Sequence, residues 1–203
     1  MLDPRRADWR PLPPAELRAL LETQHAPWWI AGGTALELFA GRSWREHGDL
    51  DAGILRADQP AVYAALPGWR RFAAHDGELR ELGAGELAPP EANSLWCRHA
   101  DESAFRFELL LDASDGAHWT FRRDPRVRLP LAELALRTRD GCPYLRPEVQ
   151  LLYKAKARRP KDEADFAVVA PLLDARACDW LRRALALVDP AHAWLTALAR
   201  STR

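Results

Sequence analysis

Residues 28–55, WWIAGGTALELFAGRSWREHGDLDAGIL, carry the pattern that decides the fold of this chain. The apolar run 28–31 is bounded by a proline on one side and two glycines on the other, which predicts a short buried strand. Thr34 is placed to cap a helix that ends at Gly41. Residues 47–55 predict a second strand. The stretch therefore predicts a strand, a glycine turn, a helix and another strand in close succession.

Two features of this stretch are typical of a site for anionic ligands and metal ions. Gly32 and Gly33 let the backbone approach a ligand closely, and the helix that follows offers unpaired N–H groups to an anion. Asp49 and Asp51 alternate with apolar residues, so on a strand they share one face, about 6.6–6.8 Å apart along the chain. Their carboxylates could then converge on divalent ions, with a third acid completing a two-ion site.

The third acid is expected on a later strand. In residues 105–112, FRFELLLD, large apolar side chains alternate with a second face that holds Glu108 and Asp112. Glu108 is the better candidate because it lies in the middle of the strand, whereas Asp112 is expected to belong to the turn 112–116.

The rest of the chain predicts mixed strands and helices up to residue 146 and helices beyond it. Proline-initiated helices are expected over 13–24 and 58–66, and short strands over 68–72, 94–99, 104–112, 119–122 and 134–138. We therefore expect an α+β (mixed α/β) protein. Its first domain, residues 1–146, would be a small mixed β-sheet flanked by helices, and residues 147–203 would form a C-terminal helical region.

Composition excludes several classes of protein. The 203 residues hold 29 basic and 29 acidic side chains, a neutral balance that argues against a nucleic-acid partner. No run of about 18 apolar residues occurs, and Met1–Arg6 lacks the apolar segment of a signal peptide, so no membrane partner is expected. Cys97, Cys142 and Cys178 fit neither a zinc spacing nor a disulfide framework, which favours the reducing cytoplasm.

The ordered set of motifs resembles the nucleotidyltransferase superfamily that includes polymerase beta. The signature of that superfamily is an apolar residue, two small residues, a gap, an acid–apolar–acid strand and a later strand acid. Residues 28–55 look closest to the branch that contains the aminoglycoside 2″-adenylyltransferases and their uncharacterised relatives. The segments 105–112, 144–156 and 160–166 are also similar to what those relatives carry. One position departs from the pattern, because the third acid is Glu108 where the wider superfamily commonly has Asp.

The resemblance implies a nucleotidyltransferase fold, a reaction and its cofactors. The reaction would transfer a nucleoside monophosphate, AMP from ATP, to a hydroxyl group with loss of pyrophosphate. The acceptor would be a small hydroxylated molecule, for example an aminoglycoside-like antibiotic. Asp49, Asp51 and Glu108 would be the catalytic residues and the ligands of two Mg²⁺ ions, with Glu108 either a metal ligand or the general base.

The same resemblance implies a nucleotide site around the glycine turn, where the phosphates would be cradled by Gly32, Gly33 and Thr34. Arg42 and Arg45 lie between the turn and the acids and could reach a phosphate, although a solvated loop explains them equally well. His47 could line the site or be a hydrogen-bonded structural histidine.

Lysine is rare in this chain, and its position adds one more candidate. There are 26 arginines but three lysines, all within residues 154–161. Lys154 follows Gln150 by four residues on a predicted helix, and its flexible ammonium group suits an outer phosphate. The alternative is a solubilising helix face. Asp162 and Asp165 are explained by the dipole of the helix that they begin.

Two other functions stay open. One is nucleotidylation of a protein or RNA hydroxyl, as in toxin-like relatives, which could use the arginine patch at Arg122, Arg123, Arg126 and Arg128. We expect that patch to be a solvated strand edge. The other is a non-catalytic relative that binds a nucleotide or a partner, against which the intact Asp49 and Asp51 argue. The chain is expected to act as a monomer or homodimer, depending on whether the tail 179–198 packs on its own sheet domain or on a second copy.

Overall fold

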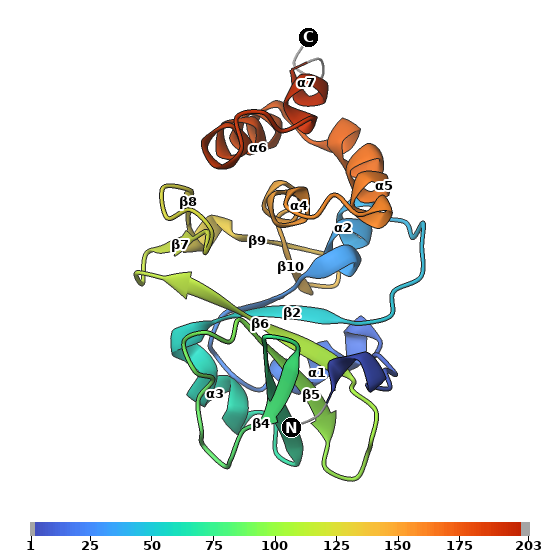
Figure 1. The fold of residues 1–203 in the computed structure, drawn as a ribbon, viewed down its shortest axis with the longest axis vertical. Coiled ribbons are helices and arrows are strands. Elements are labelled where there is room, and N and C mark those ends of the chain that lie inside the picture. The colour runs from blue at the N-terminus through green and yellow to red at the C-terminus, as the bar shows by residue number, and fades with distance from the viewer. Residues whose placement is uncertain (1–2, 200–203) are drawn as a thin grey trace.

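The structure, a computed structural model, describes residues 3–199 (Figure 1). Met1 and Leu2 of the expected first domain and residues 200–203 of the expected helical region lie outside the described residues. The described residues form ten β-strands in one mixed sheet and seven α-helices, so the expected α+β class is confirmed. The sheet is larger than the small sheet expected from the sequence.

Eight strands form the main path of the sheet in the order β4-β3-β5-β6-β2-β1-β10-β9, and β7 pairs with β6 and β8 beside this path. The pairs β2–β6 and β1–β10 are parallel, and the other pairs are antiparallel. The bounds are β1 Trp28–Ile30, β2 Asp51–Leu55, β3 Trp69–His75, β4 Glu78–Glu81, β5 Ser94–His99, β6 Phe107–Ser114, β7 His118–Thr120, β8 Arg128–Pro130, β9 Ala135–Arg137 and β10 Pro143–Leu145.

Helices cover the sheet and extend beyond it at one end. Figure 1 shows α2 and α4 between the sheet and the group α5, α6 and α7, whereas α1 and α3 lie toward the opposite end. The bounds are α1 Pro14–Leu21, α2 Gly32–Ala40, α3 Gln59–Ala64, α4 Pro147–Ala155, α5 Pro160–Val169, α6 Ala175–Val188 and α7 Trp194–Leu198. Short 3₁₀ turns occupy η1 Pro4–Arg6, η2 Arg56–Asp58, η3 Leu131–Glu133 and η4 Ala170–Leu172.

The alternation in β6 fixes which face of the sheet forms the core. Phe107, Leu109 and Leu111 are buried, whereas Glu108 on the opposite face is partly exposed, as the sequence pattern predicts. The expected turn at Asp112 is wrong. The strand continues to Ser114, and Asp112 is a buried strand residue whose Oδ1 accepts a 2.6 Å hydrogen bond from the hydroxyl of Tyr153.

The boundaries around the glycine turn also differ from the expectation. Helix α2 begins at Gly32 with Ala31 as its N-cap and no side-chain capping bond, so Thr34 lies inside the helix and does not cap it. Strand β2 begins only at Asp51, so Asp49 belongs to a loop, residues 41–50, rather than to the strand. The sequence does not predict β8 and β10, because each is three residues long and contains a proline.

The C-terminal helices pack on the rest of the same chain. Helix α6 contacts α4, and α7 contacts α6. The rings of Phe166 and Trp194 stack with centroids 4.1 Å apart, which joins α5 to α7. The three cysteines are free and buried, as core residues. Within residues 3–199, no helix combines the length and apolar character needed to cross a membrane.

A glycine in β2 tests how tightly the core is packed. A Cβ added at Gly53 would overlap the indole of Trp29, which is 2% exposed. We expect Gly53→Ala to lower the free energy of unfolding by about 1–3 kcal/mol, because the core must shift to admit the methyl group. Chemical denaturation measures the change. Gly48→Ala is the control, because a Cβ there meets nothing within 4 Å, and it should change stability by less than about 0.5 kcal/mol. Equal effects of the two substitutions would contradict this packing.

Candidate active site

Three carboxylates meet at one end of the parallel pair β2–β6. The register of that pair places Asp51 directly beside Glu108, and the Glu108 amide donates to the carbonyl of Leu50 at 2.8 Å. Asp49 comes from the loop that precedes β2. One carboxylate oxygen of each acid lies within 4.8 Å of one from each of the other two. The structure therefore brings together the three acids that the sequence singles out.

The acids differ in exposure, and their environment disfavours negative charge. Asp49 is exposed, whereas Asp51 and Glu108 are half-buried. Burial raises the pKa of Asp51 well above its ordinary value, and the charges of Glu108 and Asp49 act in the same direction, while Lys154 opposes them. Burial also raises the pKa of Glu108. Crowded carboxylate oxygens are the ligands that Mg²⁺ prefers, so this donor set fits a divalent cation.

The start of α2 lies against this cluster. Gly32 has a left-handed backbone with φ +67°, and a Cβ at this position would collide with the carboxylate of Asp51. Its amide donates a buried 2.8 Å hydrogen bond to Oε1 of Gln150 on α4. The Gly32 amide is thus already engaged in this conformation. Gly33 and Thr34, in the first helical turn, remain the predicted phosphate donors, because first-turn amides have no partner within their own helix.

Gly33 leaves room for two side chains of the loop 41–50. A Cβ at Gly33 would collide with the guanidinium of Arg45 and the imidazole of His47, so both side chains lie over the start of α2. Arg42 is exposed. It lines a cavity of about 580 Å³ together with Thr34, His47 and Asp49. Arg45 and His47 are therefore packed against the turn, rather than being part of a solvated loop.

Glu37 on α2 holds this loop through its carboxylate, and it is not among the residues predicted for the site. Its Oε1 accepts hydrogen bonds from the amides of Trp44 at 3.0 Å and Arg45 at 3.4 Å, and its Oε2 lies 3.2 Å from Nε2 of His47. Burial raises the pKa of Glu37, but hydrogen bonds from Trp44, Ser43 and His47 outweigh it and leave the pKa below its ordinary value. The available signal was an acid between two leucines within a predicted helix.

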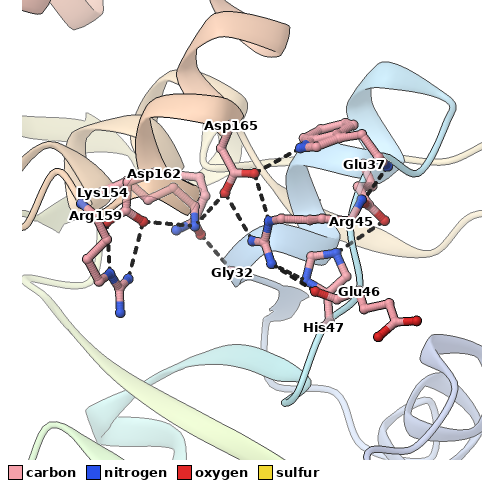
Figure 2. Close-up of polar contacts among 11 residues, drawn as sticks. Gly32, Glu37, Arg45, Glu46, His47, Lys154, Arg159, Asp162 and Asp165 are labelled. Carbon is pink, nitrogen blue, oxygen red and sulfur yellow. Dashed lines mark hydrogen bonds and ion pairs between the residues drawn. The ribbon is translucent and has the colours of Figure 1, made fainter.

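A buried ion-pair network joins the loop to α5 (Figure 2). Arg45 donates from Nε to Asp165 Oδ1 at 2.9 Å and from Nη2 to Oδ2 at 3.0 Å. Lys154 Nζ lies 2.8 Å from Asp165 Oδ2 and 3.5 Å from Asp162 Oδ1. Arg159 pairs with Asp162 at 2.9 Å. Both aspartates have fully buried side chains, so the helix dipole alone does not explain them, contrary to the expectation.

This network also changes the interpretation of Lys154. Its side chain is 7% exposed, so it is not part of a solubilising helix face. It remains close enough to the acid cluster to lower the pKa of Asp51. Contact between Lys154 and a phosphate stays a prediction.

Two arginines of the expected strand-edge patch lie near the cluster. Arg122 and Arg123 line a small cavity of about 130 Å³ that Asp51 and Gln150 also line. Arg123 Nη1 donates to the carbonyl of Tyr153 at 2.9 Å. No local sequence pattern indicates this position, because it depends on how the segment after β7 packs against α4.

Comparison with known proteins identifies the fold. A family model for aminoglycoside-2″-adenylyltransferase matches residues 15–71, which include Asp49 and Asp51 and end before Glu108. The lincosamide antibiotic adenylyltransferase LnuA, solved with lincomycin bound, gives a TM-score of 0.52 at 18% identity over 76% of this chain and 92% of that chain. ANT(2″)-Ia in complex with adenylyl-2″-tobramycin gives 0.53 at 14% identity over 84% of this chain and 92% of that chain. No curated protein sequence matches. The chain has a nucleotidyltransferase fold, and the resemblance seen in its sequence is confirmed.

The crowding of the acids predicts how stability responds to metal and pH. Because the pKa values of Asp51 and Glu108 are raised in the folded state, the metal-free protein loses stability as pH rises through them. Mg²⁺ should therefore raise the Tm at pH 7.5 and do so less near pH 5. Asp51→Asn should raise the Tm in EDTA by about 2–4 °C, for roughly 1 kcal/mol of relieved repulsion, and remove the response to Mg²⁺.

Differential scanning fluorimetry with a Mg²⁺ titration checks this expectation. Glu91→Gln, which removes an exposed loop carboxylate, is the control and should respond to Mg²⁺ as the wild type does. The cluster does not bind the ion if Mg²⁺ leaves the wild-type Tm unchanged, or if it raises the Tm of Asp51→Asn as much as that of the wild type.

Proposed function

We propose that this protein is a Mg²⁺-dependent nucleotidyltransferase that transfers AMP from ATP to a hydroxyl group of a small molecule, for example an aminoglycoside-like antibiotic. The observation that carries the proposal is the cluster of Asp49, Asp51 and Glu108 against the start of α2. The family-model match over residues 15–71 and the fold shared with two antibiotic adenylyltransferases support it.

The acids would hold the metal. Asp49 and Asp51 would ligate Mg²⁺, and Glu108 would either complete the ligand set or take the proton of the acceptor hydroxyl, since burial raises its pKa above the ordinary value and makes it a stronger base. When bound to these carboxylates, Mg²⁺ would supply positive charge that offsets the negative charge developing as the bond to pyrophosphate breaks.

Donors around the glycine turn would bind the triphosphate. ATP is strongly anionic, so its phosphates need backbone N–H groups and cationic side chains. The first turn of α2 would supply amides, and the surrounding loop and α4 would supply the side chains of Arg42, Arg45, His47 and Lys154. The amide of Gly32 would join them only after leaving Gln150.

The transfer would form one bond to phosphorus and break another. The acceptor oxygen forms a bond to the α-phosphorus of ATP, and the bond from that phosphorus to the bridging oxygen of pyrophosphate breaks. Glu108 or a water molecule takes the hydroxyl proton. Pyrophosphate leaves with the electron pair.

The size of the cavity beside Asp49 is compatible with a small-molecule ligand. The cavity that reaches Asp49 measures about 580 Å³, within the range of roughly 300–1,000 Å³ typical of small-molecule sites. LnuA was solved with lincomycin and ANT(2″)-Ia with adenylyl-2″-tobramycin, so lincosamides and aminoglycosides are the first acceptors to test. Three buried free thiols support a place in the cytoplasm. Nucleotidylation of a protein or RNA is the second candidate.

An adenylylation assay tests the proposal. Incubation of the protein with ATP, Mg²⁺ and panels of aminoglycosides and lincosamides should add one AMP to at least one compound, detected by mass spectrometry. Asp49→Asn should lower the rate at least about 100-fold, because a removed metal ligand costs several kcal/mol of charge stabilisation. Label that appears on protein or RNA instead would favour the second candidate. If the wild type neither binds nor turns over ATP with Mg²⁺, the chain is a non-catalytic relative.

A further inference from the structure

We propose that Asp165 is a positioning residue, which holds the loop 41–50 from helix α5 and thereby fixes Asp49 beside Asp51 and Glu108. The inference rests on the proposed function in one respect, since it takes Asp49 to be a metal ligand.

The loop needs an external anchor. Residues 42–50 contain no helix or strand, yet Asp49 must be placed to within a fraction of an ångström for its carboxylate to share an ion with two others. Glu37 binds the loop backbone at Trp44 and Arg45. Glu37 Oε2 also lies 3.2 Å from Nε2 of His47. All these contacts come from the helix that leads into the loop, so they tie the loop to α2 alone.

Asp165 fixes the side chains of the same two residues. Its Oδ1 accepts from Nε1 of Trp44 at 3.0 Å and from Nε of Arg45 at 2.9 Å. Its Oδ2 accepts from Nη2 of Arg45 at 3.0 Å and lies 2.8 Å from Nζ of Lys154. Figure 2 shows this carboxylate between the loop and α4. Each oxygen therefore has two donors, in a geometry that leaves the arginine fork little freedom.

The charge on Asp165 is kept by these donors. Burial raises the pKa of Asp165, but the hydrogen bonds from Arg45, Lys154 and Trp44 outweigh burial and leave the pKa below its ordinary value. A buried carboxylate that loses its partners strongly destabilises the folded protein, so movement of the loop away from Asp165 is energetically unfavourable.

Arg45 also contacts the loop residues that lie between it and Asp49. Its Nη1 donates to the carbonyl of Glu46 at 3.3 Å and lies 3.1 Å from Nδ1 of His47, two residues before Asp49. The hydrogen bond to Asp165 raises the pKa of Arg45, and the charge of Asp49 adds to that rise, so Arg45 also attracts Asp49. The glycine at position 33 is what lets this guanidinium lie over the start of α2.

Asp162 offers a matched control on the same helix. It too is fully buried, and it too lies near Lys154, at 3.5 Å. Its other partner is Arg159, the N-cap residue of α5, and not the loop. Asp162→Asn therefore removes the same charge and disturbs the same lysine without releasing residues 42–49.

Hydrogen exchange tests the anchor directly, without any need for activity. In Asp165→Asn, the amides of residues 42–49 should exchange at least tenfold faster than in the wild type, whereas in Asp162→Asn only residues near the start of α5 should change. Arg45→Lys removes the paired hydrogen bonds to Asp165 from the side of the partly exposed arginine, and it should also accelerate loop exchange. This variant replaces Asp165→Asn in the experiment if Asp165→Asn does not fold. The loop amides of the double variant, Asp165→Asn with Arg45→Lys, should exchange no faster than those of the stronger single variant, because both substitutions remove the same contact.

Mn²⁺ binding, followed by the EPR signal of the free ion, tests the consequence for the site. We expect the dissociation constant for Mn²⁺ to be about tenfold higher in Asp165→Asn than in the wild type, and to change less than twofold in Asp162→Asn. The positioning role is overturned if the loop amides of Asp165→Asn and Arg45→Lys exchange at the wild-type rate. It is also overturned if Asp162→Asn accelerates loop exchange and weakens Mn²⁺ binding as much as Asp165→Asn does. A wild type that binds no Mn²⁺ overturns the proposed function instead, and the exchange experiment then decides the anchor alone.

Discussion

The parallel register of β2 with β6 is the constraint on which the site depends. It places Asp51 beside Glu108, so two carboxylates share a half-buried face, and Asp49 adds a third. Burial and the neighbouring negative charges raise the pKa values of Asp51 and Glu108, which opposes folding at neutral pH. Positive charge has to lie nearby. Lys154 and Lys161 act on Asp51 in that sense, and the network around α5 sets three cations, Lys154, Arg45 and Arg159, against two carboxylates.

That network gives a physical reason for one of the chain's rare lysines. Lys154 fits its ammonium group between Asp162 and Asp165 while only 7% of its side chain is exposed. A compact ammonium group can meet two carboxylates from one point, whereas a guanidinium is planar and wider and directs its donors along fixed lines. Arginine serves elsewhere in the network, at Arg45, where one carboxylate is bound side-on through two nitrogens.

Local sequence patterns were sufficient for part of the site and insufficient for the rest. The two-residue period of β6 identified Glu108, and the acid pair identified Asp51, because alternation alone decides which face a strand side chain occupies. Asp49 was found although its predicted strand is a loop. The partners of that loop and of the glycine turn could not be predicted in the same way. Arg45 and Asp165 lie 120 residues apart, and Gly32 and Gln150 lie 118 apart, so only the packing of α2, α4 and α5 brings them together.

The contact between α5 and the loop limits how this chain can be divided or recombined. A fragment ending at residue 146 would retain all three acids, but Arg45 and the Gly32 amide would lose the partners that bind them, Asp165 and Gln150. Exchanging the C-terminal helices for those of another protein would remove the same two partners. Such a chimera would keep the contacts of Arg45 and Gly32 only if residues 150–165 were retained together with the sheet.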